Sequence, residues 1–381
     1  MKDLLVSDTK NKIAEKLIGY DVNLVRYFKN PNANNDFTIL LGGSGTGKTT
    51  ALDGLKIQAA EMGRQVISIE IADSGNFAGM QQELVTKLVA LTDTIDVRQH
   101  ALTMPLIFGD KDEAAATLAR LISRIFGLAE TYEDAVEVAL QKAIREGKLA
   151  IEGLSIVVDY LKKMKTNEAR AALRKITPLM GNINIKDGPF EFDKPIFQID
   201  FSGYSIADQI ILEEFVLWSI LQCAERGDFR EKGLMLACDE FQNISTQKGS
   251  AMYYLLQIAR KEGVGMLLAT PEFPLKQSSA SYLALEQCST ALFFQPGLMD
   301  TAKVAALIAD DINHWSLELA TLERGEFVAV RGLVDEEGNK ILDPITLRTP
   351  KVVSGYKAND EKSDETAQND EESDAVDELI N

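Results

Sequence analysis

Eight consecutive residues, from Gly42 to Thr49, have the types and spacing of a loop that binds phosphate. Their sequence, GGSGTGKT, fits the pattern G-x-x-x-x-G-K-[ST]. Glycines let successive backbone N–H groups curl around phosphate oxygens, while Lys48 neutralises phosphate charge and the Thr49 hydroxyl binds Mg²⁺. We therefore predict a nucleotide site in this phosphate loop. Its expected binding residues are Gly43, Ser44, Gly45, Thr46, Gly47, Lys48, Thr49 and Thr50.

Two adjacent carboxylates, Asp239 and Glu240, follow the apolar run Leu234–Cys238. Hydrolysis of a bound nucleotide needs one carboxylate for the metal ion and a group that orients or deprotonates the attacking water. We expect Asp239 to hold Mg²⁺ through its water shell and Glu240 to act as the general base. Taken alone, such a pair is commonly a plain junction between strand and loop. Together with the phosphate loop it is typical of ATPases that use a catalytic glutamate.

Short apolar runs rich in β-branched residues recur along the chain, with helical patterns between them. They predict strands at residues 37–41, 66–71, 195–201, 234–238, 265–270, 291–295 and 326–330. Continuous apolar strands separated by helices indicate an α/β fold with a mostly parallel sheet covered by helices on both faces. The phosphate loop then follows the strand 37–41 and opens a helix with an apolar face.

The other patterns divide the chain into four parts. We expect residues 1–36 to form an N-terminal segment, 37–76 and 190–350 the core domain, 77–189 a large helical insertion, and 351–381 an acidic disordered tail. Turn residues at 335–339 lie between two apolar runs, 327–334 and 341–347, which predicts a β-hairpin at the C-terminal end of the core. Ser205 and Asp208 have the spacing of a helix N-cap, and the apolar pattern after them continues to about Arg226.

Composition excludes several classes of protein. With 381 residues, 45 % of them hydrophobic, and a formal charge of −18, the chain is acidic and able to bury a sizeable core. It contains neither a run of eighteen apolar residues nor an apolar N-terminal region, which argues against a membrane span and a secretory signal. Three dispersed cysteines and two distant histidines argue against a disulfide framework or a His/Cys metal site. These features favour a cytoplasmic protein.

The negative charge is unevenly distributed. Residues 357–381 carry a charge of −8, so the first 356 residues carry −10. The tail cannot bury enough apolar surface to become ordered, and it either keeps the protein soluble or docks a partner through Leu379 and Ile380. The opposite bias occurs at residues 162–175, where six cations accompany a single acid, Glu168. This basic stretch is either a surface that contacts nucleic acid or an ordinary solvated helix face.

The order of these motifs resembles the HerA/FtsK superfamily of DNA-translocating ATPases. The residues that carry the resemblance are the phosphate loop, Asp239-Glu240, the segments 258–263 and 266–270, and the late segment 322–327. The resemblance implies a RecA-like core of the ASCE class that assembles into a ring, usually a hexamer, with ATP and Mg²⁺ between subunits and DNA in the pore. The helical insertion and residues 197–202 are further similar to the ATPase module of the restriction protein DptH and related bacterial defence ATPases.

The resemblance also gives a role to Arg260. In such rings an arginine beyond the acidic motif reaches the γ-phosphate of the neighbouring subunit, and Arg260, which lies 21 residues after Asp239, is the best match. An arginine finger of this kind accelerates hydrolysis by about 10³–10⁵. The alternative is an exposed arginine in the last turn of a helix, where its charge complements the helix dipole.

Two features depart from the superfamily. Many relatives carry Thr-Gln after the fifth strand, where the amide senses the γ-phosphate, but this chain has Thr270-Pro271-Glu272. The sensor is then Thr270 or Glu272, unless the segment is a simple loop. HerA proteins also carry a β-barrel before the core, whereas 36 residues precede Phe37 here. We therefore expect either a module of a larger protein or a ring whose assembly depends on a partner.

The leading hypothesis is a Mg²⁺-dependent ATPase that drives DNA translocation as an oligomeric ring, coupled to a nuclease, restriction or packaging partner. The alternative is an ATP-gated switch or scaffold that assembles protein partners without DNA transport. Pro271 and the charge of the first 356 residues favour the switch, while Asp239-Glu240 and Arg260 favour the translocase. A small-molecule kinase is a weaker third hypothesis, because the sequence shows no Arg-rich lid and 191 residues separate Lys48 from Asp239.

Overall fold

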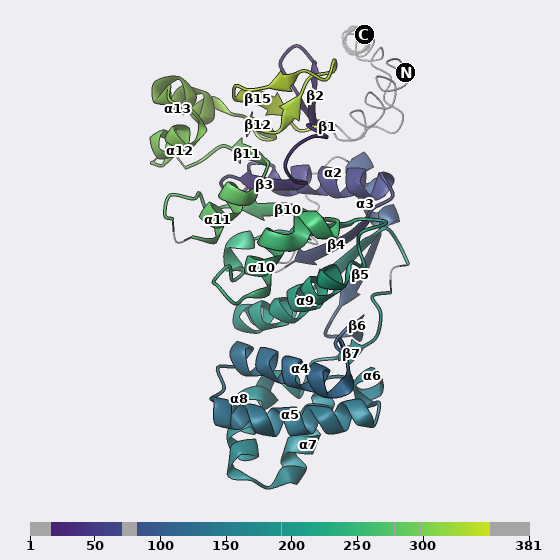
Figure 1. Ribbon diagram of the computed structural model, residues 1–381. Coiled ribbons are helices and arrows are strands. Elements are labelled where there is room, and N and C mark those ends of the chain that lie inside the picture. The colour runs from purple at the N-terminus through teal and green to yellow at the C-terminus, as the bar shows by residue number, and fades with distance from the viewer. Residues whose placement is uncertain (1–16, 71–81, 192, 278, 298, 351–381) are drawn as a thin grey trace, which may run out of the picture.

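The computed structural model describes residues 17–70, 82–191, 193–277, 279–297 and 299–350. A mixed sheet of thirteen strands runs through this part of the chain, in the order β14-β13-β2-β1-β15-β12-β11-β3-β10-β9-β4-β8-β5. Figure 1 shows three regions stacked along the long axis of the molecule: the antiparallel end of the sheet, the parallel part with its helices, and a helical bundle. The predicted tail, residues 351–381, lies outside the described residues.

Seven adjacent strands form the parallel part of the sheet. They are β3 (Phe37–Leu41), β4 (Gln65–Glu70), β5 (Thr92–Asp96), β8 (Ile196–Asp200), β9 (Leu234–Cys238), β10 (Val264–Thr270) and β11 (Thr290–Phe294). Every residue of β3, β9, β10 and β11 is buried, which explains their continuous apolar sequences. The predicted α/β fold with a mostly parallel core sheet is confirmed.

The remaining strands of the sheet are antiparallel and combine the two ends of the described chain. They are β1 (Leu17–Tyr20), β2 (Arg26–Lys29), β12 (Glu326–Val330), β13 (Leu333–Val334), β14 (Lys340–Ile341) and β15 (Ile345–Arg348). The predicted C-terminal hairpin is present, because β13 pairs with β14 and β12 pairs with β15. The N-terminal segment also belongs to this unit, since β1 pairs with β15 and β2 with β13.

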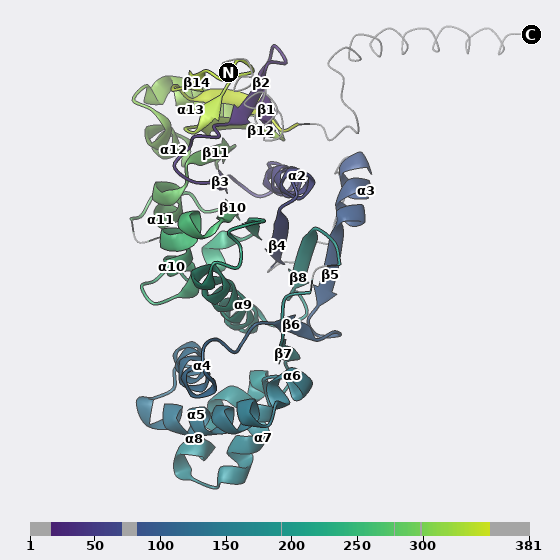
Figure 2. The ribbon, with the colours of Figure 1, turned by 45° about the vertical axis from the view of Figure 1, so that its right-hand side comes forward.

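Helices cover both faces of the parallel strands, as Figure 2 shows. One face carries α2 (Lys48–Glu61) and α3 (Gln82–Leu91), whose buried residues share a hydrophobic cluster with alternate residues of β4 and β9. The other face carries α9 (Ile206–Arg226), α10 (Ala251–Ile258) and α11 (Ala280–Gln287). Two further helices, α12 (Thr301–Ile308) and α13 (Ile312–Thr321), precede β12. Two short 3₁₀ helices, η1 (Phe241–Asn243) and η2 (Ala259–Glu262), flank α10.

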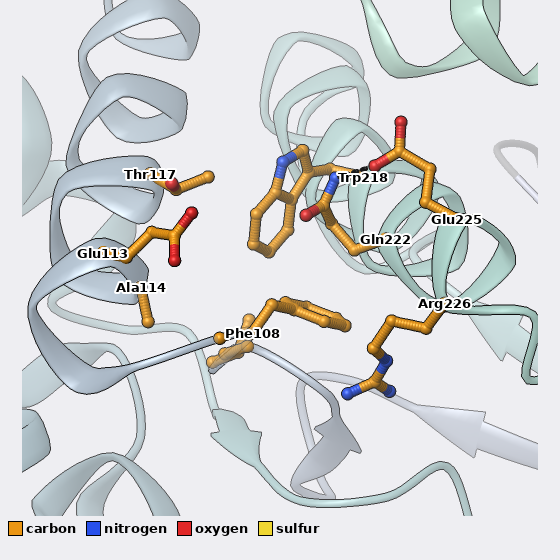
Figure 3. A pocket seen from close by; sticks show the side chains of 10 residues that line it. Phe108, Glu113, Ala114, Thr117, Trp218, Gln222, Glu225 and Arg226 are labelled. Atoms are coloured by element: carbon orange, nitrogen blue, oxygen red, sulfur yellow. Dashed lines mark hydrogen bonds between the residues drawn. The ribbon is translucent and has the colours of Figure 1, made fainter.

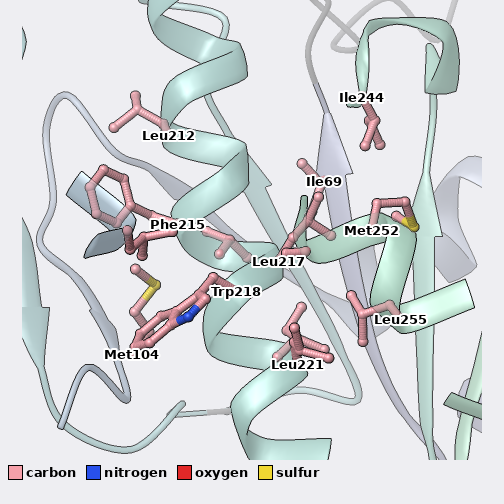
Figure 4. Close-up of a cluster of buried hydrophobic side chains, with 14 of the residues drawn as sticks. Ile69, Met104, Leu212, Phe215, Leu217, Trp218, Leu221, Ile244, Met252 and Leu255 are labelled. Atoms are coloured by element: carbon pink, nitrogen blue, oxygen red, sulfur yellow. The ribbon is translucent and has the colours of Figure 1, made fainter. Parts of the chain in front are cut away.

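Helix α9 is the central element of the second face. The Ser205 side chain caps it by accepting a hydrogen bond from the Asp208 amide, and Gly227 ends it in a left-handed conformation, as the sequence predicted for the N-cap. Figure 4 shows side chains from successive turns of α9 packed against side chains of α10 and against Ile69 of β4. This packing fixes α9 behind the strands β4 and β9, whose ends carry the candidate site.

A bundle of five helices protrudes from the parallel sheet, opposite its antiparallel end. The helices are α4 (Lys111–Ile125), α5 (Glu130–Arg145), α6 (Lys148–Glu152), α7 (Ser155–Met164) and α8 (Asn167–Met180). The predicted insertion, 77–189, is therefore not helical throughout. It also contains β5, which pairs with β8 in the main sheet, and the parallel pair β6 (Leu102–Met104) and β7 (Ile185–Asp187) that leads to the bundle.

The joint between bundle and core is aromatic. Phe108 meets Trp218 of α9 edge to face, with ring centroids 5.3 Å apart, and the Arg226 guanidinium lies 4.6 Å from the Phe108 ring centroid. Figure 3 shows these side chains in a pocket between α4 and α9, which has a volume of about 230 Å³. None of the helices in the described part of the chain combines the length and apolar character needed to cross a bilayer.

Candidate nucleotide-binding site

The phosphate loop leaves the buried strand β3 and enters α2 at Lys48. Gly45 and Gly47 have φ angles of 79° and 104°, which residues with a Cβ adopt only with strain. The Lys48 ammonium donates a hydrogen bond to the Gly43 carbonyl at 2.9 Å, and the Thr46 hydroxyl donates to the same oxygen at 2.8 Å. Lys48 is thus folded back onto the loop, with its ammonium against the Gly43 carbonyl.

Strand order brings the second motif to the same edge of the sheet. In the parallel register Leu41 of β3 is opposite Thr270 of β10, and Leu268 of β10 is opposite Cys238 of β9. The carboxyl ends of these strands therefore lie together, which is where open parallel sheets bind their ligands. At this edge the Thr49 hydroxyl donates a hydrogen bond to the Asp239 carboxylate at 3.2 Å. Residues 190 positions apart thus form one polar centre.

The charges of Asp239 and Glu240 affect the pKa of Lys48. Burial lowers the pKa of the Lys48 ammonium, and the charges of Asp239 and Glu240 oppose that effect. The two carboxylates are therefore close enough to Lys48 to act on its protonation. A loop of backbone amides with one lysine and two nearby carboxylates can hold a polyphosphate together with a divalent cation.

Glu240 adopts an unusual backbone conformation. Its φ angle is 53° and its ψ angle 40°, a left-handed geometry that is uncommon for a residue other than glycine. Its amide donates to the Asp239 carboxylate at 2.9 Å, and its carboxylate accepts a hydrogen bond from the Gln242 side chain. Strained residues of this kind cluster at functional sites, where the surrounding structure holds them.

Gln242 is a site residue that sequence reasoning missed. Its amide nitrogen donates to Glu240, while its amide oxygen accepts a hydrogen bond at 3.0 Å from the Thr270 hydroxyl at the end of β10. The Glu272 amide in turn donates to the Thr270 hydroxyl at 3.1 Å. Many members of the superfamily that this sequence resembles carry a glutamine directly after this strand, where Pro271 stands here. In this chain the amide comes from η1 and reaches the same strand end.

A late loop closes one side of the phosphate loop. The Gly325 amide donates to the Thr46 carbonyl at 2.9 Å, and a Cβ on Gly47 would lie 2.9 Å from the Gly325 nitrogen. Beside this contact is a pocket of about 300 Å³, within the range of small-ligand sites, and it is lined by residues of the phosphate loop and of the late strands. The lining residues are Gly47, Thr50, Leu84, Glu323, Arg324, Gly325, Glu326, Arg348, Thr349 and Pro350.

The pocket adds two arginines, Arg324 and Arg348, to which the sequence analysis gave no role, although Arg324 lies in the selected segment 322–327. Arg348 pairs with Glu326 at 2.7 Å, whereas no ion pair forms between Arg324 and the other described residues. Both side chains are exposed beside Thr50. The signal in the sequence was the glycine after Arg324, because its φ angle of 88° is one that a residue with a Cβ adopts only with strain.

Arg260 does not join this centre within one chain. It lies exposed in η2, immediately before the amino end of β10. Thr270, which contacts Gln242, is at the carboxyl end of this seven-residue strand, about 20 Å from its amino end at the usual rise of a strand. Arg260 is therefore at the opposite edge of the sheet from the phosphate loop of its own chain.

The basic stretch lies in the bundle, at the end of α7 and along α8. Its first and last members are engaged within the chain, since Lys162 pairs with Asp159 at 3.1 Å and Lys175 donates to the Gly127 carbonyl. Arg170 and Arg174, one helical turn apart, are exposed on one face of α8. Figure 1 shows this bundle at the end of the molecule remote from the antiparallel strands.

The donor set suits Mg²⁺ better than a transition metal. In the described part of the chain no three His, Cys, Asp or Glu side chains are grouped as a metal-binding cluster. The three cysteines, Cys223, Cys238 and Cys288, are free and buried. Mg²⁺ is usually bound by one or two protein oxygens together with phosphate and water. The Thr49 hydroxyl and the Asp239 carboxylate, 3.2 Å apart, supply these two oxygens.

Known structures share the fold of this chain. VirB4 of Thermoanaerobacter pseudethanolicus aligns with a TM-score of 0.62 at 16 % identity, over 88 % of this chain and 96 % of VirB4. The bacterial plasmid coupling protein TrwB, in its complex with ADP and Mg²⁺, aligns with a TM-score of 0.57 at 13 % identity, over 92 % of this chain and 94 % of TrwB. The chain has the RecA-like fold of P-loop ATPases. No family model and no curated protein sequence matches it.

The RecA-like fold confirms what the sequence resemblance to HerA/FtsK-type ATPases implied about architecture. The alignments cover most of this chain and of the solved VirB4 and TrwB chains, so they are not confined to the parallel core. TrwB has also been solved with a non-hydrolysable GTP analogue, and that structure aligns with a TM-score of 0.58. The resemblance to DptH is not tested by these structures.

Proposed function

We propose that this chain is a Mg²⁺-dependent ATPase that moves DNA as part of an oligomeric ring. The observation that carries the ATPase assignment is the contact between Thr49 and Asp239, which joins the phosphate loop to the acidic motif at one sheet edge. Lys48 and Glu240 face the same centre. This set contains the groups that phosphoryl transfer to water requires, and it lies on a fold that TrwB uses with ADP and Mg²⁺.

Each group has a role that follows from its position. The phosphate-loop amides and Lys48 bind the β- and γ-phosphates of ATP, and Lys48 exchanges the Gly43 carbonyl for phosphate oxygen. Thr49 and Asp239 would hold Mg²⁺, which neutralises charge that develops on the phosphates. The pocket beside Thr50 accepts the nucleoside, with Arg324 and Arg348 at its wall. The nucleotide thus lies between the phosphate loop and the late strands.

Glu240 acts as the general base on the attacking water. Its carboxylate is oriented by the Gln242 amide, which is itself held by Thr270. A base that is fixed by a hydrogen bond loses less entropy when it orients water. We assign to Gln242 the role that a glutamine after the fifth strand has in related ATPases. Pro271 is then compatible with a functional γ-phosphate sensor.

The position of Arg260 supports a ring. An exposed arginine about one strand length from its own phosphate loop is too distant to act on its own nucleotide, so any action on a nucleotide would be at the site of another subunit. In a head-to-tail ring each Arg260 would face the neighbouring site, where its charge stabilises the transition state. The exposed cations of α8 offer DNA a restricted surface on an otherwise acidic molecule. A nuclease, restriction or packaging protein is the expected partner.

ATP turnover with and without DNA tests this proposal. We expect hydrolysis that needs Mg²⁺ and is stimulated by double-stranded or single-stranded DNA. Lys48→Ala should abolish nucleotide binding, and Glu240→Gln should bind ATP but not hydrolyse it. Glu286→Gln, which removes an exposed carboxylate on α11, is the matched control. If DNA of several lengths changes neither turnover nor electrophoretic mobility, translocation is excluded while the ATPase assignment stands.

The second candidate is an ATP-gated switch that assembles protein partners. The acidic charge of the first 356 residues favours it, because a protein that binds DNA needs a basic surface. Glu240→Gln separates the two candidates. A translocase with this substitution traps ATP and stops, whereas a switch still assembles with its partners when ATP is bound.

A further inference from the structure

A buried lysine with two buried carboxylates lies between α2 and the parallel sheet. Lys56 is 1 % exposed, Asp53 4 % and Glu70 6 %. The Lys56 ammonium is 2.6 Å from the Asp53 carboxylate and 3.6 Å from the Glu70 carboxylate. We call these three residues the buried trio. No step of the proposed mechanism uses them.

The trio is held by two further polar side chains. The Lys56 ammonium donates a hydrogen bond to the Ser68 hydroxyl at 3.3 Å, and the Gln198 amide donates to Glu70 at 2.9 Å. Asp53 and Lys56 belong to α2, Glu70 and Ser68 to β4, and Gln198 to β8. The network therefore joins the helix that follows the phosphate loop to two adjacent strands.

The trio lies directly beside the proposed metal centre. Asp53 is one helical turn after Thr49, and so lies on the same side of α2. In the register of the sheet Ile69 is opposite Cys238, so the next residues, Glu70 and Asp239, lie side by side where β4 and β9 end. Burial raises the pKa of both Asp53 and Glu70, and the negative charge of Asp239 adds a smaller effect in the same direction. Thr49 and Asp239 thus each have a neighbour in the trio.

Burying the three charges of the trio costs free energy that a purely structural role would not require. Burial alone lowers the pKa of Lys56, but Asp53 and Glu70 outweigh it and keep the ammonium charged. Two carboxylates then share one cation out of contact with water. Uncharged side chains of similar volume commonly stabilise such a site equally well or better, whereas removing one partner alone leaves an uncompensated charge. A stability role therefore gives no reason for charges at this position.

We propose that Lys56, with Asp53 and Glu70, is a positioning residue for the metal half of the nucleotide site. The ammonium ties α2, which carries Thr49, to β4, the strand beside Asp239, and so sets the separation of the two oxygens that would hold Mg²⁺. This inference rests on the proposed Mg²⁺-dependent ATPase. It predicts that the trio controls the affinity for Mg²⁺ and leaves the binding of nucleotide phosphates by Lys48 unchanged.

The main variant replaces all three charges by uncharged groups of similar volume: Asp53→Asn, Lys56→Met and Glu70→Gln. We expect it to unfold at the same urea concentration as wild type or a higher one. The Mg²⁺ concentration that gives half-maximal binding of a fluorescent non-hydrolysable ATP analogue should rise about 10- to 100-fold, the usual effect of losing groups that orient metal ligands. Binding of the analogue in EDTA should stay within about twofold of wild type.

A single variant covers the case in which the triple variant does not fold. Glu70→Gln keeps the pair formed by Lys56 and Asp53 and weakens only the tie to β4. It should raise the Mg²⁺ requirement in the same direction, by a smaller factor. The matched control is Lys29→Met, which removes another buried lysine, bonded to the Thr38 hydroxyl at 2.9 Å near the amino end of β3. We expect it to lower stability without moving the Mg²⁺ half-point.

The Mg²⁺ half-points of these variants decide whether the trio is a positioning element. A folded triple or single variant with the wild-type Mg²⁺ half-point overturns the positioning role. The same holds if Lys29→Met shifts the half-point by an equal factor, since the effect would then be a general loosening of the sheet. If the wild-type protein itself binds no nucleotide with Mg²⁺, the proposed function fails, which is a different result from failure of the trio.

Discussion

Replacing Glu70 by glutamine should change how stability depends on pH. Burial raises the pKa of the Glu70 carboxyl from 4.5 to about 7, although the charge of Lys56 lowers it, and the charges of Asp53 and Asp239 add to the effect of burial. The folded chain therefore binds this proton more tightly than the unfolded chain does. The cost of ionising Glu70 in the fold is absent below pH 4.5, grows as the pH rises toward 7, and is fully present above it.

The size of the effect follows from the two pKa values. At about 1.4 kcal/mol for each tenfold change in proton affinity, ionised Glu70 costs the native state about 3 kcal/mol. Between about pH 5 and about pH 8, wild type should lose about 2.5 kcal/mol of unfolding free energy through this group, and Glu70→Gln should not.

Urea unfolding of wild type and variant across this pH range, without nucleotide, measures the difference directly. Subtracting one curve from the other removes the titration of groups that both proteins share. Glu168→Gln, at an exposed position in the first turn of α8, controls for the loss of one carboxylate. A stability difference between wild type and Glu70→Gln that stays constant from about pH 5 to about pH 8 would refute the reasoning.

Three further predictions concern the nucleotide site. Gly47→Ala should destabilise the fold by about 1–3 kcal/mol and abolish nucleotide binding, because its φ is 104° and the new Cβ would contact Gly325; urea unfolding and a binding titration measure both effects. Glu240→Gly and Glu240→Ala should both lack hydrolysis, but the glycine variant should be more stable by about 1 kcal/mol because it adopts a φ of 53° without strain; equal stabilities would contradict this. Arg260→Ala alone and Glu240→Gln alone should be inactive, yet their mixture should hydrolyse ATP, since an intact base then meets an intact arginine; an inactive mixture would argue against action between subunits.

The parallel core was predictable because its strands are buried on both faces and therefore have continuous apolar sequences. The predicted strand at 234–238 coincides with β9, and that at 265–270 falls short of β10 by one residue. The phosphate loop and the acidic pair were predictable for a different reason, since their chemistry requires fixed residue types at fixed spacing. Their proximity follows once the strands are parallel, because such strands end at one edge of the sheet.

Other features depend on contacts between residues far apart in the chain, which the local sequence does not indicate. The sequence of strand β5 is Thr-Asp-Thr-Ile-Asp, in which aspartate, a residue type depleted in strands, occurs twice. Backbone pairing with β8 holds it at the edge of the sheet. Gln242 is one polar residue in a short 3₁₀ helix, and its partner Thr270 is 28 residues away. Lys56 and Glu70 resemble ordinary surface charges in the sequence, because burial of a charged group appears only when both partners are placed. Tertiary contacts, and not propensity, decide these positions.

The contact between Gly325 and Thr46 has a consequence for the order of folding during synthesis. Gly325 precedes β12, which lies in the sheet between β11 and β15, and β15 ends at Arg348. The phosphate loop, near the start of the chain, is therefore completed on one side by residues that leave the ribosome about 300 positions later. Until β15 pairs with β1 and β12, a nascent chain has the residues of the phosphate loop without the wall that closes it. Tight nucleotide binding should thus begin only when synthesis of the core is complete.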